Sequence, residues 1–278
     1  MVTKMKNINI LSLVQAYNSL GNDNYVDFTN YYGVEIKNKE VEDLEQLIGY
    51  LYSTSGDKII FHQFYVGYKI PQISKEFDLL RFGKDCVINI ELKNKSTEEK
   101  VKNQLRRNKH YLSHIKDTIY NFSFVVDTRT LYILNSLGEI EIAEPALLIQ
   151  LLTSQEVEHI GNVDKLFNPS DYLVSPFNST DKFIDNQYFL TGHQDDVKNK
   201  ILTRIGNDTI PNLISVTGSA GTGKTLLVYD IVKEIKKIKT ALIIHCGYLN
   251  EGHEKLKEAG WDIIPIRDIR QGEIANVF

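Results

Sequence analysis

The chain has 278 residues, of which 42% are hydrophobic and 24% charged, an ordinary balance for a globular protein whose length favours two domains. No apolar run reaches the roughly 18 residues that a membrane helix needs, and the opening "MVTKMKNINI" lacks the apolar stretch of a signal peptide. The net charge of −4 excludes a protein that binds nucleic acid through uniform positive charge, although a local basic stripe would still suffice.

The two cysteines, Cys86 and Cys246, lie far apart in strand-like runs. Thiols in such positions are usually buried and reduced, so we expect a cytoplasmic protein without a membrane partner.

The first 166 residues predict a mixed α/β domain. The helical spacing of apolar residues and the aromatic and β-branched runs indicate a helix, three strands, a second helix, two further strands and a closing helix. In chain order these are a helix at 33–52, a strand within 57–70, two strands within 76–92 joined by a tight turn at 83–85, a helix from the capping box of Ser96 and Glu99 to 116, strands at 121–127 and 130–136, and a helix at 144–160.

Residues 167–186 hold two prolines and many Ser, Asn and Asp residues, so we interpret them as a linker over the surface. From residue 187 to residue 278 the pattern becomes helix, strand, glycine-rich loop, helix and strand, which favours a parallel α/β sheet.

The strongest motif is Gly218, Ser219, Ala220, Gly221, Thr222, Gly223, Lys224 and Thr225, which fits G-x-x-x-x-G-K-[ST]. The β-branched run "LISV" precedes it and an amphipathic helix follows. In such a loop the glycines let backbone N–H groups surround a phosphate, Lys224 reaches the β and γ oxygens of ATP, and the Thr225 hydroxyl holds Mg²⁺. A chance glycine-rich turn is the alternative.

The preceding segment "YFLTGHQDDVKNKIL" resembles the adenine-reading segment of superfamily 1 helicases, which implies that the Gln194 amide hydrogen-bonds the adenine edge. Alternatively, Thr191 caps a helix and Gln194 takes the third helical position, and both roles are compatible.

A phosphate loop also needs an acid at the end of a later strand to complete its Mg²⁺ site. Asp262 precedes its apolar run and Asp268 follows an arginine, so neither fits that pattern. ATP hydrolysis by this chain alone is therefore doubtful, and we expect the N-terminal part of a longer protein or a chain that needs a partner.

The stretch "CVINIELKNK" ends a strand with an acid and a base two residues apart. Because side chains alternate along a strand, Glu91 and Lys93 face the same side, and a hairpin at Gly83 places Asp78 nearly opposite Ile90 and Glu91. Two carboxylates and an ammonium suit Mg²⁺-dependent phosphodiester cleavage, since Mg²⁺ prefers oxygen ligands and an ammonium can orient water or stabilise negative charge. Ordinary charges at a solvent-exposed strand end are the alternative.

The pattern of Asp78 followed by Glu91-Leu92-Lys93 resembles the PD-(D/E)xK nuclease family. The resemblance implies a restriction-endonuclease-like mixed sheet flanked by helices, with Asp78 and Glu91 as ligands of Mg²⁺ or Mn²⁺ and Lys93 positioning water. It also implies an acid on the first helix, for which Glu45 is preferred over Glu42, and Gln104 on the following helix. Tyr111 is the weaker partner of Gln104, because the usual spacing of four residues is seven here.

The segment that contains the helix after the motif is basic, with eight Lys or Arg residues from Lys93 to Lys116 inclusive. A phosphate backbone could be contacted by Lys100, Arg107 and Lys109, and also by Arg106. A solvated helix face is the simpler interpretation. His110 and His114 have zinc-helix spacing but lack the accompanying Glu, so we interpret them as surface or nucleic-acid-contacting residues.

Together the two motifs resemble bacterial fusions of a PD-(D/E)xK nuclease with a superfamily 1-type or Schlafen-like helicase domain, here a partial RecA-like P-loop domain. The resemblance implies a Mg²⁺-dependent DNA nuclease coupled to ATP binding, with a role in defence against foreign DNA. RNA is the alternative substrate, and a second copy of the chain or further polypeptide is the expected protein partner. Alternatively, the chain is an inactive, nucleotide-gated module that binds nucleic acid or protein, or an ATP-dependent switch unrelated to nucleic acid.

Overall fold

The structure is a computed structural model that describes residues 4–71, 75–207 and 213–269. The chain divides into two compact units, Met1–Asp171 and Tyr172–Phe278, and each is described by itself. Both combine helices and strands, so the predicted α/β class is confirmed at this level. Among the described residues, no helix combines the length and the apolar character that crossing a bilayer requires.

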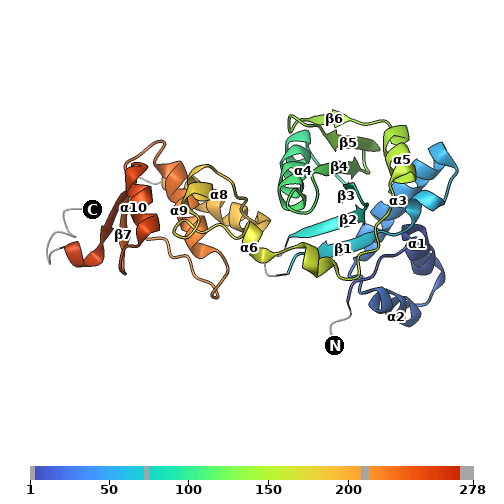
Figure 1. Ribbon diagram of the computed structural model, residues 1–278, viewed down its shortest axis with the longest axis horizontal. Coiled ribbons are helices and arrows are strands. Elements are labelled where there is room, and N and C mark those ends of the chain that lie inside the picture. Colours follow the sequence, from blue (N-terminus) through green and yellow to red (C-terminus); the bar gives the residue numbers. More distant parts are fainter. Residues whose placement is uncertain (1–3, 72–74, 208–212, 270–278) are drawn as a thin grey trace. The chain divides into compact units, whose positions relative to one another are not determined.

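A mixed six-stranded sheet, ordered β1-β2-β3-β4-β5-β6, forms the centre of the first unit (Figure 1). Only β3 and β4 run parallel; the other neighbours are antiparallel. Helix α4 (Glu98–Leu112) connects the parallel pair, as parallel strands require a long crossover. The strands are β1 (Tyr65–Lys69), β2 (Glu76–Phe82), β3 (Cys86–Lys93), β4 (Thr118–Val125), β5 (Thr130–Leu134) and β6 (Ile140–Ile142).

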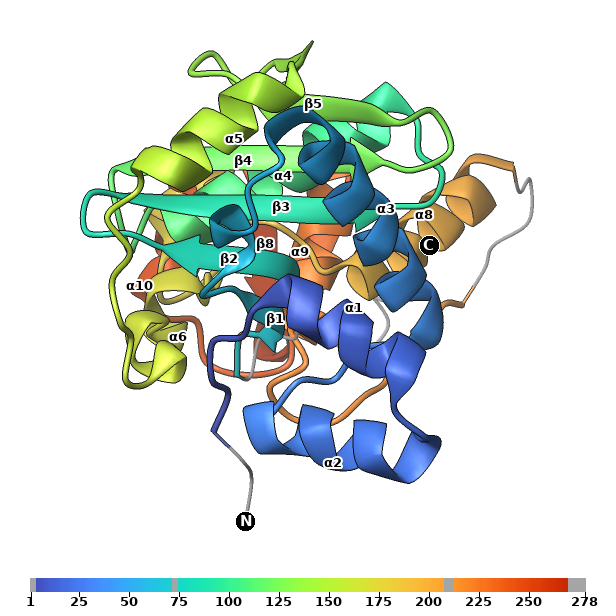
Figure 2. The same ribbon diagram turned by 90° about the vertical axis from the view of Figure 1, so that its right-hand side faces the viewer.

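One face of this sheet carries the main apolar core. Ile88, Ile90 and Leu92 alternate along β3 and pack with Phe122 and Phe124 of β4. Helices α1 (Ile10–Ser19), α3 (Asn38–Ser55) and α5 (Pro145–Ser154) supply the apolar residues that cover this face, and Figure 2 shows α3 and α5 in front of the strands. Burial of these alternating residues fixes which side chains of β3 face the opposite way.

Helix α4 (Glu98–Leu112) covers the other face, where Val101 and Leu105 pack against Val125 and Leu134. The helix begins one residue later than predicted, because the Thr97 hydroxyl rather than that of Ser96 accepts the Lys100 N–H, at 3.4 Å. Residues 89, 91 and 93 of β3 lie on this face, at and beside the helix.

The predicted hairpin between β2 and β3 is present. The Gly83 N–H donates to the Cys86 carbonyl at 2.8 Å, and Leu79 is paired with Ile90. Asp78, one residue before Leu79, therefore lies at the level of Glu91, within the range that the sequence predicted.

The N-terminal part of the unit differs from the prediction in extent. Two helices that the sequence reading did not predict, α1 and α2 (Asn22–Tyr32), precede α3. Helix α3 begins at Asn38 and continues to Ser55, where Gly56 ends it with a φ of 63°, a conformation that favours glycine. The aromatic run at 57–70 forms a short 3₁₀ turn at Ile59–Phe61 before the strand β1 begins.

The second unit contains a two-stranded parallel sheet of β7 (Leu242–His245) and β8 (Asp262–Pro265) with helices around it. The hydrophobic core of this unit includes Phe183, Tyr188, Tyr229 and Trp261. The helices are α7 (Thr180–Ile184), α8 (Gly192–Asn207), α9 (Lys224–Ile235) and α10 (Glu251–Glu258), and the short α6 (Pro169–Tyr172) lies at the boundary of the units.

The strand predicted in the run "LISV" is not formed. Its four residues, Leu213 to Val216, have no assigned secondary structure, and the Leu213 side chain is 99% exposed. A β-branched run becomes a strand only where a neighbouring strand offers hydrogen bonds and a surface to pack on. Neither β7 nor β8 pairs with it.

The structure corrects two further expectations, namely that both cysteines are buried and that residues 167–186 form a linker over the surface. Cys246 is exposed and Cys86 is half-buried, although both are free thiols. The segment 167–186 does not simply cross the surface: Phe167 packs against Tyr68 and Phe77 in the first unit, and Phe183 is completely buried in the second. Apolar residues within a polar segment thus anchor both of its ends.

Candidate functional site

Glu91 is the buried centre of the candidate site in the first unit. Its side chain is 1% exposed and lies on the α4 face of β3. The Gln104 amide donates to Glu91 Oε2, and the Asn108 amide donates to Oε1 at 2.7 Å. Both donors belong to α4, one helical turn apart. A buried carboxylate needs such donors because an unpaired buried charge is very costly.

Asp78 and Lys93 complete the group. The Leu92 N–H donates to Asp78 Oδ2 at 2.7 Å, which fixes the carboxylate across the two strands. The Lys93 ammonium lies 3.9 Å from Asp78 Oδ2 and 3.7 Å from Glu91 Oε2. The three residues that the sequence placed on one strand face therefore do converge. Asp78 and Lys93 are about 30% exposed, so the group opens to solvent on their side.

The negative charges of Asp78 and Glu91 are not fully balanced by the neighbouring ammonium groups. Burial, and then the negative charge of Glu91, raise the pKa of Asp78 from 3.8 to about 7. The Lys93 ammonium, the Leu92 N–H and the Lys75 ammonium oppose that rise without cancelling it. Two carboxylates that repel each other in a poorly solvated place are suited to a bound cation.

Lys75 is a neighbouring residue that sequence reasoning missed. Burial lowers the pKa of its ammonium group, while the charges of Glu91 and Asp78 raise it. Its Nζ lies 4.3 Å from the centre of the Phe77 ring and donates to the Glu76 carbonyl oxygen. Nothing in the local pattern distinguishes this lysine from a surface lysine that precedes a strand.

A pocket of about 100 Å³ opens beside Asp78 and Lys93. We call it the acid pocket, because Glu40 of α3 and Glu76 of β2 also line it. The remaining lining residues are Ile36, Val66, Gly67, Leu79 and Leu92.

The helix acid that reaches this pocket is Glu40, not the predicted Glu45. Glu45 Oε1 accepts a hydrogen bond from the Asn18 amide at 2.9 Å on the exposed side of α3, and neither Glu45 nor Glu42 lines the pocket. Because α3 begins at Asn38, Glu40 is in its first turn, the part that meets the pocket. Glu40 also caps the helix by accepting the Lys37 N–H at 3.0 Å.

The partner of Gln104 on α4 is Asn108 rather than Tyr111. Tyr111 is 6% exposed, and burial raises the pKa of its hydroxyl, but Asn108 is the residue that shares Glu91 with Gln104. A search for a hydrogen-bonding side chain four residues after Gln104 would have found it. Two of the four basic side chains proposed to contact a phosphate backbone have partners within the chain. Arg106 donates to the Gly138 carbonyl at 2.7 Å, and Lys109 donates to the Ser136 carbonyl at 3.5 Å.

A polar layer lies beside Glu91 in the sheet. Ser123 of β4 is paired with Glu91, and Asn89 of β3 is paired with Asn121 of β4. All three neighbours are at most 2% exposed, and their side-chain polar atoms have no hydrogen-bond partner in the part of the chain that the structure describes. Buried polar groups of this kind are expensive, so the strands keep a polar interior around Glu91 at a cost in stability.

The donor set is compatible with a divalent cation. Mg²⁺ keeps several water ligands and needs only one or two protein carboxylates, which Asp78 and Glu91 provide. Among the described residues, no group of three or more His, Cys, Asp or Glu side chains has the arrangement of a metal site. The two-carboxylate arrangement is therefore what this unit offers to a cation.

The pKa of Asp78 makes a prediction about folding stability in metal-free buffer. A carboxyl whose pKa is raised on folding stabilises the folded chain most when it is protonated, so this contribution is lost as pH rises from about 4 to about 7. The full loss is on the order of 4 kcal/mol. Thermal unfolding of Asp78→Asn in EDTA should lack this slope and show a higher Tm than the unsubstituted chain at pH 8.

Two results separate this prediction from a general pH effect. Adding Ca²⁺ at pH 8 should stabilise the unsubstituted chain and leave Asp78→Asn nearly unchanged, because the cation relieves the repulsion between Asp78 and Glu91. Parallel Tm–pH curves for the two proteins would show that Asp78 and Glu91 do not interact as the geometry requires.

The glycine-rich motif 218–225, predicted to be a phosphate loop, lies at the N-terminus of α9, which begins at Lys224. Gly221 and Gly223 have φ values of 78° and 73°, which favour glycine and allow the loop to curl. The Lys224 ammonium donates to the carbonyl oxygens of Gly218 at 2.9 Å and Ser219 at 2.7 Å, inside that curl. Thr225 follows in the first turn of the helix with an exposed side chain.

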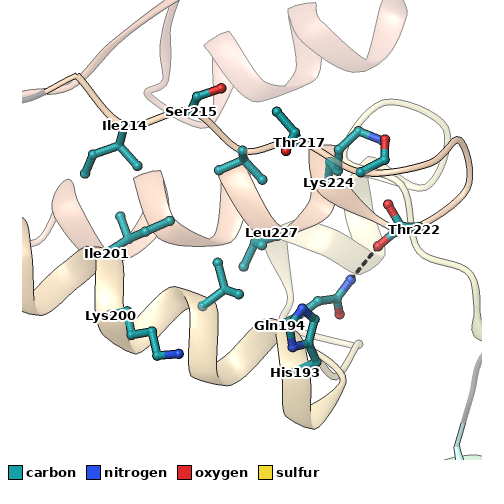
Figure 3. Close-up of a pocket in the computed structure, with 13 residues that line it drawn as sticks. His193, Gln194, Lys200, Ile201, Ile214, Ser215, Thr217, Thr222, Lys224 and Leu227 are labelled. Atoms are coloured by element: carbon teal, nitrogen blue, oxygen red, sulfur yellow. Dashed lines mark hydrogen bonds between the residues drawn. The ribbon is translucent and has the colours of Figure 1, made fainter.

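A pocket of about 450 Å³ lies between this loop and α8 (Figure 3). We call it the loop pocket. One end holds Lys224, Thr222 and Gln194, and the remainder is mixed, with five aliphatic side chains beside several polar ones. A ligand with a phosphate tail and a flat body that carries some polar atoms would match this lining. The other lining residues are His193, Val197, Lys200, Ile201, Ile214, Ser215, Val216, Thr217, Gly218 and Leu227.

Gln194 has the capping role that the sequence allowed and also contacts the loop. Its N–H donates to the Thr191 hydroxyl at 3.2 Å, and its Oε1 accepts the Thr191 N–H at 2.8 Å. The amide nitrogen donates to the Thr222 carbonyl at 3.0 Å, the bond drawn in Figure 3. Adenine reading by Gln194 stays a prediction.

Gln194→Ala separates the two roles. If the amide reads adenine, the Kd for ATP should rise about tenfold while the weaker binding of GTP changes little, because one base-specific hydrogen bond is lost. Equilibrium titration with both nucleotides measures this. An equal loss for ATP and GTP would assign Gln194 to positioning the loop alone.

The acidic residues considered for the nucleotide site lie elsewhere. Asp262 begins β8, and Asp268 is in a short turn, 3.6 Å from the Arg267 guanidinium. Strand β7 ends at His245. None of these residues is among those that line the loop pocket.

Comparison of the chain with models of protein families, with curated proteins and with solved structures produced no match.

Proposed function

We propose that the chain is a Mg²⁺-dependent DNA nuclease of the PD-(D/E)xK type whose second unit binds ATP. The observation that carries this proposal is the convergence of Asp78, Glu91 and Lys93 across β2 and β3, with one ammonium within 4 Å of both carboxylates. The succession of α3, β1 to β3, α4 and β4 supports the proposal, because it is the order that the resemblance implies.

Asp78 and Glu91 would hold the divalent cation, here Mg²⁺ or Mn²⁺. Bound there, the ion would polarise a phosphodiester and lower the pKa of a water ligand. The chain's own part is to hold the ligands in place: the Leu92 N–H fixes Asp78, while Gln104 and Asn108 fix Glu91. Rigidly oriented ligands are worth roughly 10- to 100-fold in metal affinity or activity.

Lys93 would act on the reacting groups. Its ammonium is between the two carboxylates and partly exposed, so it can donate to an attacking water or to a phosphate oxygen as negative charge develops. The neighbouring Lys75 also interacts with both carboxylates, although burial lowers the pKa of its ammonium group. A phosphodiester is therefore the substrate class that this combination of charges fits.

The second unit would bind ATP in the loop pocket, with Lys224 at the phosphates and Thr225 at the accompanying Mg²⁺. Support comes from the positive φ angles of Gly221 and Gly223, from the helix that begins at Lys224, and from the aliphatic side chains among those that line the loop pocket. A RecA-like arrangement has weaker support, because Leu213 to Val216 do not pair with β7 or β8.

The decisive experiment incubates the full chain with end-labelled single-stranded DNA, duplex DNA and RNA in Mg²⁺, Mn²⁺, Ca²⁺ or EDTA. We expect cleavage of DNA in Mg²⁺ and Mn²⁺ only, and binding without cleavage in Ca²⁺. Faster cleavage of RNA would change the substrate. Salt-sensitive binding without cleavage in any metal would instead assign the chain to the inactive binding modules.

A further inference from the structure

The first unit contains a second large hollow, formed by the N-terminal segment, the end of α2 and residues 159–161. Its volume is about 440 Å³, within the range of ligand-binding pockets. We call it the tyrosine pocket. It is lined by Lys4, Met5, Lys6, Asn7, Tyr31, Tyr32, Tyr65, His159, Ile160 and Gly161.

Most residues that line the tyrosine pocket are aromatic or basic. It combines three tyrosines and a histidine with two lysines, and none of these lining residues is acidic. The whole chain has 36 acidic against 32 basic residues, so the absence of acids here is local. Aromatic rings stack on nucleobases, and ammonium groups attract phosphate. A flat, anionic ligand such as a nucleotide fits both.

Backbone hydrogen bonds hold the walls of the tyrosine pocket in place. The Lys6 N–H donates to the Tyr32 carbonyl at 2.8 Å, and Ile8 exchanges bonds of 2.7 and 2.9 Å with Phe64. The Tyr65 hydroxyl donates to the Ile160 carbonyl at 2.9 Å. The Lys6 ammonium lies 3.6 Å from the centre of the Tyr31 ring, so cation and aromatic surface are already together. A pocket with fixed walls loses little entropy on binding.

A third hollow, lined in part by Glu35 and Asp164, shares lining residues with both the tyrosine pocket and the acid pocket. It has a volume of about 410 Å³ and shares Lys4 and Met5 with the tyrosine pocket and Gly67 with the acid pocket. Gly67 lies at the level of Asp78 in the β1–β2 pair, since Val66 is paired with Leu79 and Tyr68 with Phe77. The third hollow is therefore a neighbour of both the acid pocket and the tyrosine pocket.

We propose that the tyrosine pocket binds one nucleotide, with its base against the rings of Tyr31 and Tyr32, since Tyr65 is buried, and its phosphate at Lys4 and Lys6. We assign this nucleotide to the strand that is cut at Asp78 and Glu91, because the third hollow shares lining residues with the pockets at both places. The assignment to a strand rests on the function proposed above, whereas the nucleotide chemistry rests on the pocket alone.

The test measures binding in EDTA, so that cleavage has no influence. The protein is the full chain with Lys224→Ala, which removes the phosphate loop as a competing site. The probes are a fluorescent 12-nucleotide single-stranded DNA and free AMP. The variants are Tyr31→Ala and Lys6→Glu, and the matched control is Tyr52→Ala, an exposed tyrosine of α3 outside the pocket. Tyr31 is 61% exposed, so its truncation spares the core.

We expect Tyr31→Ala to weaken binding of the oligonucleotide about tenfold, the effect of losing one stacked base, and Tyr52→Ala to leave it unchanged. Lys6→Glu should weaken it as much and flatten its salt dependence. If AMP binds and Tyr31→Ala weakens that binding, the pocket is a nucleotide site, but its ligand is a free nucleotide and not a DNA strand. If both pocket variants bind both probes within twofold of the parent, the pocket is not a nucleotide site, whatever the cleavage assay shows.

Discussion

Glu91→Gln is expected to reduce Mg²⁺-dependent cleavage of DNA by the full chain at least about 1,000-fold. The substitution removes the charge of the most buried acid in the group, and a metal contributes several kcal/mol to the transition state, each 1.4 kcal/mol of which is tenfold in rate. Glutamine keeps the shape and one acceptor oxygen toward Asn108, so the fold should survive. Initial rates on end-labelled DNA at saturating metal measure the effect.

Glu45→Gln is the matched control for this change. Glu45 is also a carboxylate of the first unit, but it accepts the Asn18 amide and does not line the acid pocket, so its loss should leave the rate within about twofold. The control thus tests the geometry as well as the chemistry. Undiminished cleavage by Glu91→Gln would remove Glu91 from the proposed site, and an equal loss in both variants would point to a general effect of charge.

Glu91→Ala adds a separate measurement of stability. It leaves the Gln104 and Asn108 amides without their buried acceptor, which should cost roughly 1 to 3 kcal/mol of unfolding free energy. Glu91→Gln should cost less. Denaturant unfolding of both variants therefore separates a folding defect from the loss of a ligand.

Lys224→Ala is expected to weaken ATP binding by about 10- to 150-fold. The Lys224 ammonium now donates to the Gly218 and Ser219 carbonyl oxygens, and a phosphate entering the curl of the loop would take it as its partner. A hydrogen bond to a charged group is worth about 1.5 to 3 kcal/mol, which gives the expected change in Kd. Isothermal titration of the full chain with ATP measures it.

Lys237→Ala controls for the loss of a lysine from the same region. Lys237 lies just after α9, is 63% exposed and pairs with Glu234, outside the loop pocket. Its removal should not change ATP affinity. Unaltered ATP affinity of Lys224→Ala would mean that the loop does not hold phosphate, and the loop pocket would then need another ligand.

The local pattern predicted the parts of both sites that depend on one or two neighbouring elements. Glu91 and Lys93 share a face because side chains alternate along any strand, and a tight turn at Gly83 brings Asp78 to the same level. The phosphate loop is likewise contained in eight consecutive residues whose glycines allow the curl. Nothing distant is needed for these arrangements.

The sequence by itself therefore determined the α/β class, the convergence of Asp78, Glu91 and Lys93, and the loop that begins α9. Only the tertiary structure decided that Glu40 rather than Glu45 reaches the acid pocket, that Asn108 rather than Tyr111 holds Glu91, and that Leu213 to Val216 form no strand. The physical reason is the same in each case. Which residue of a helix meets a sheet depends on where the helix begins and how it packs, and whether an apolar run forms a strand depends on a partner elsewhere in the chain.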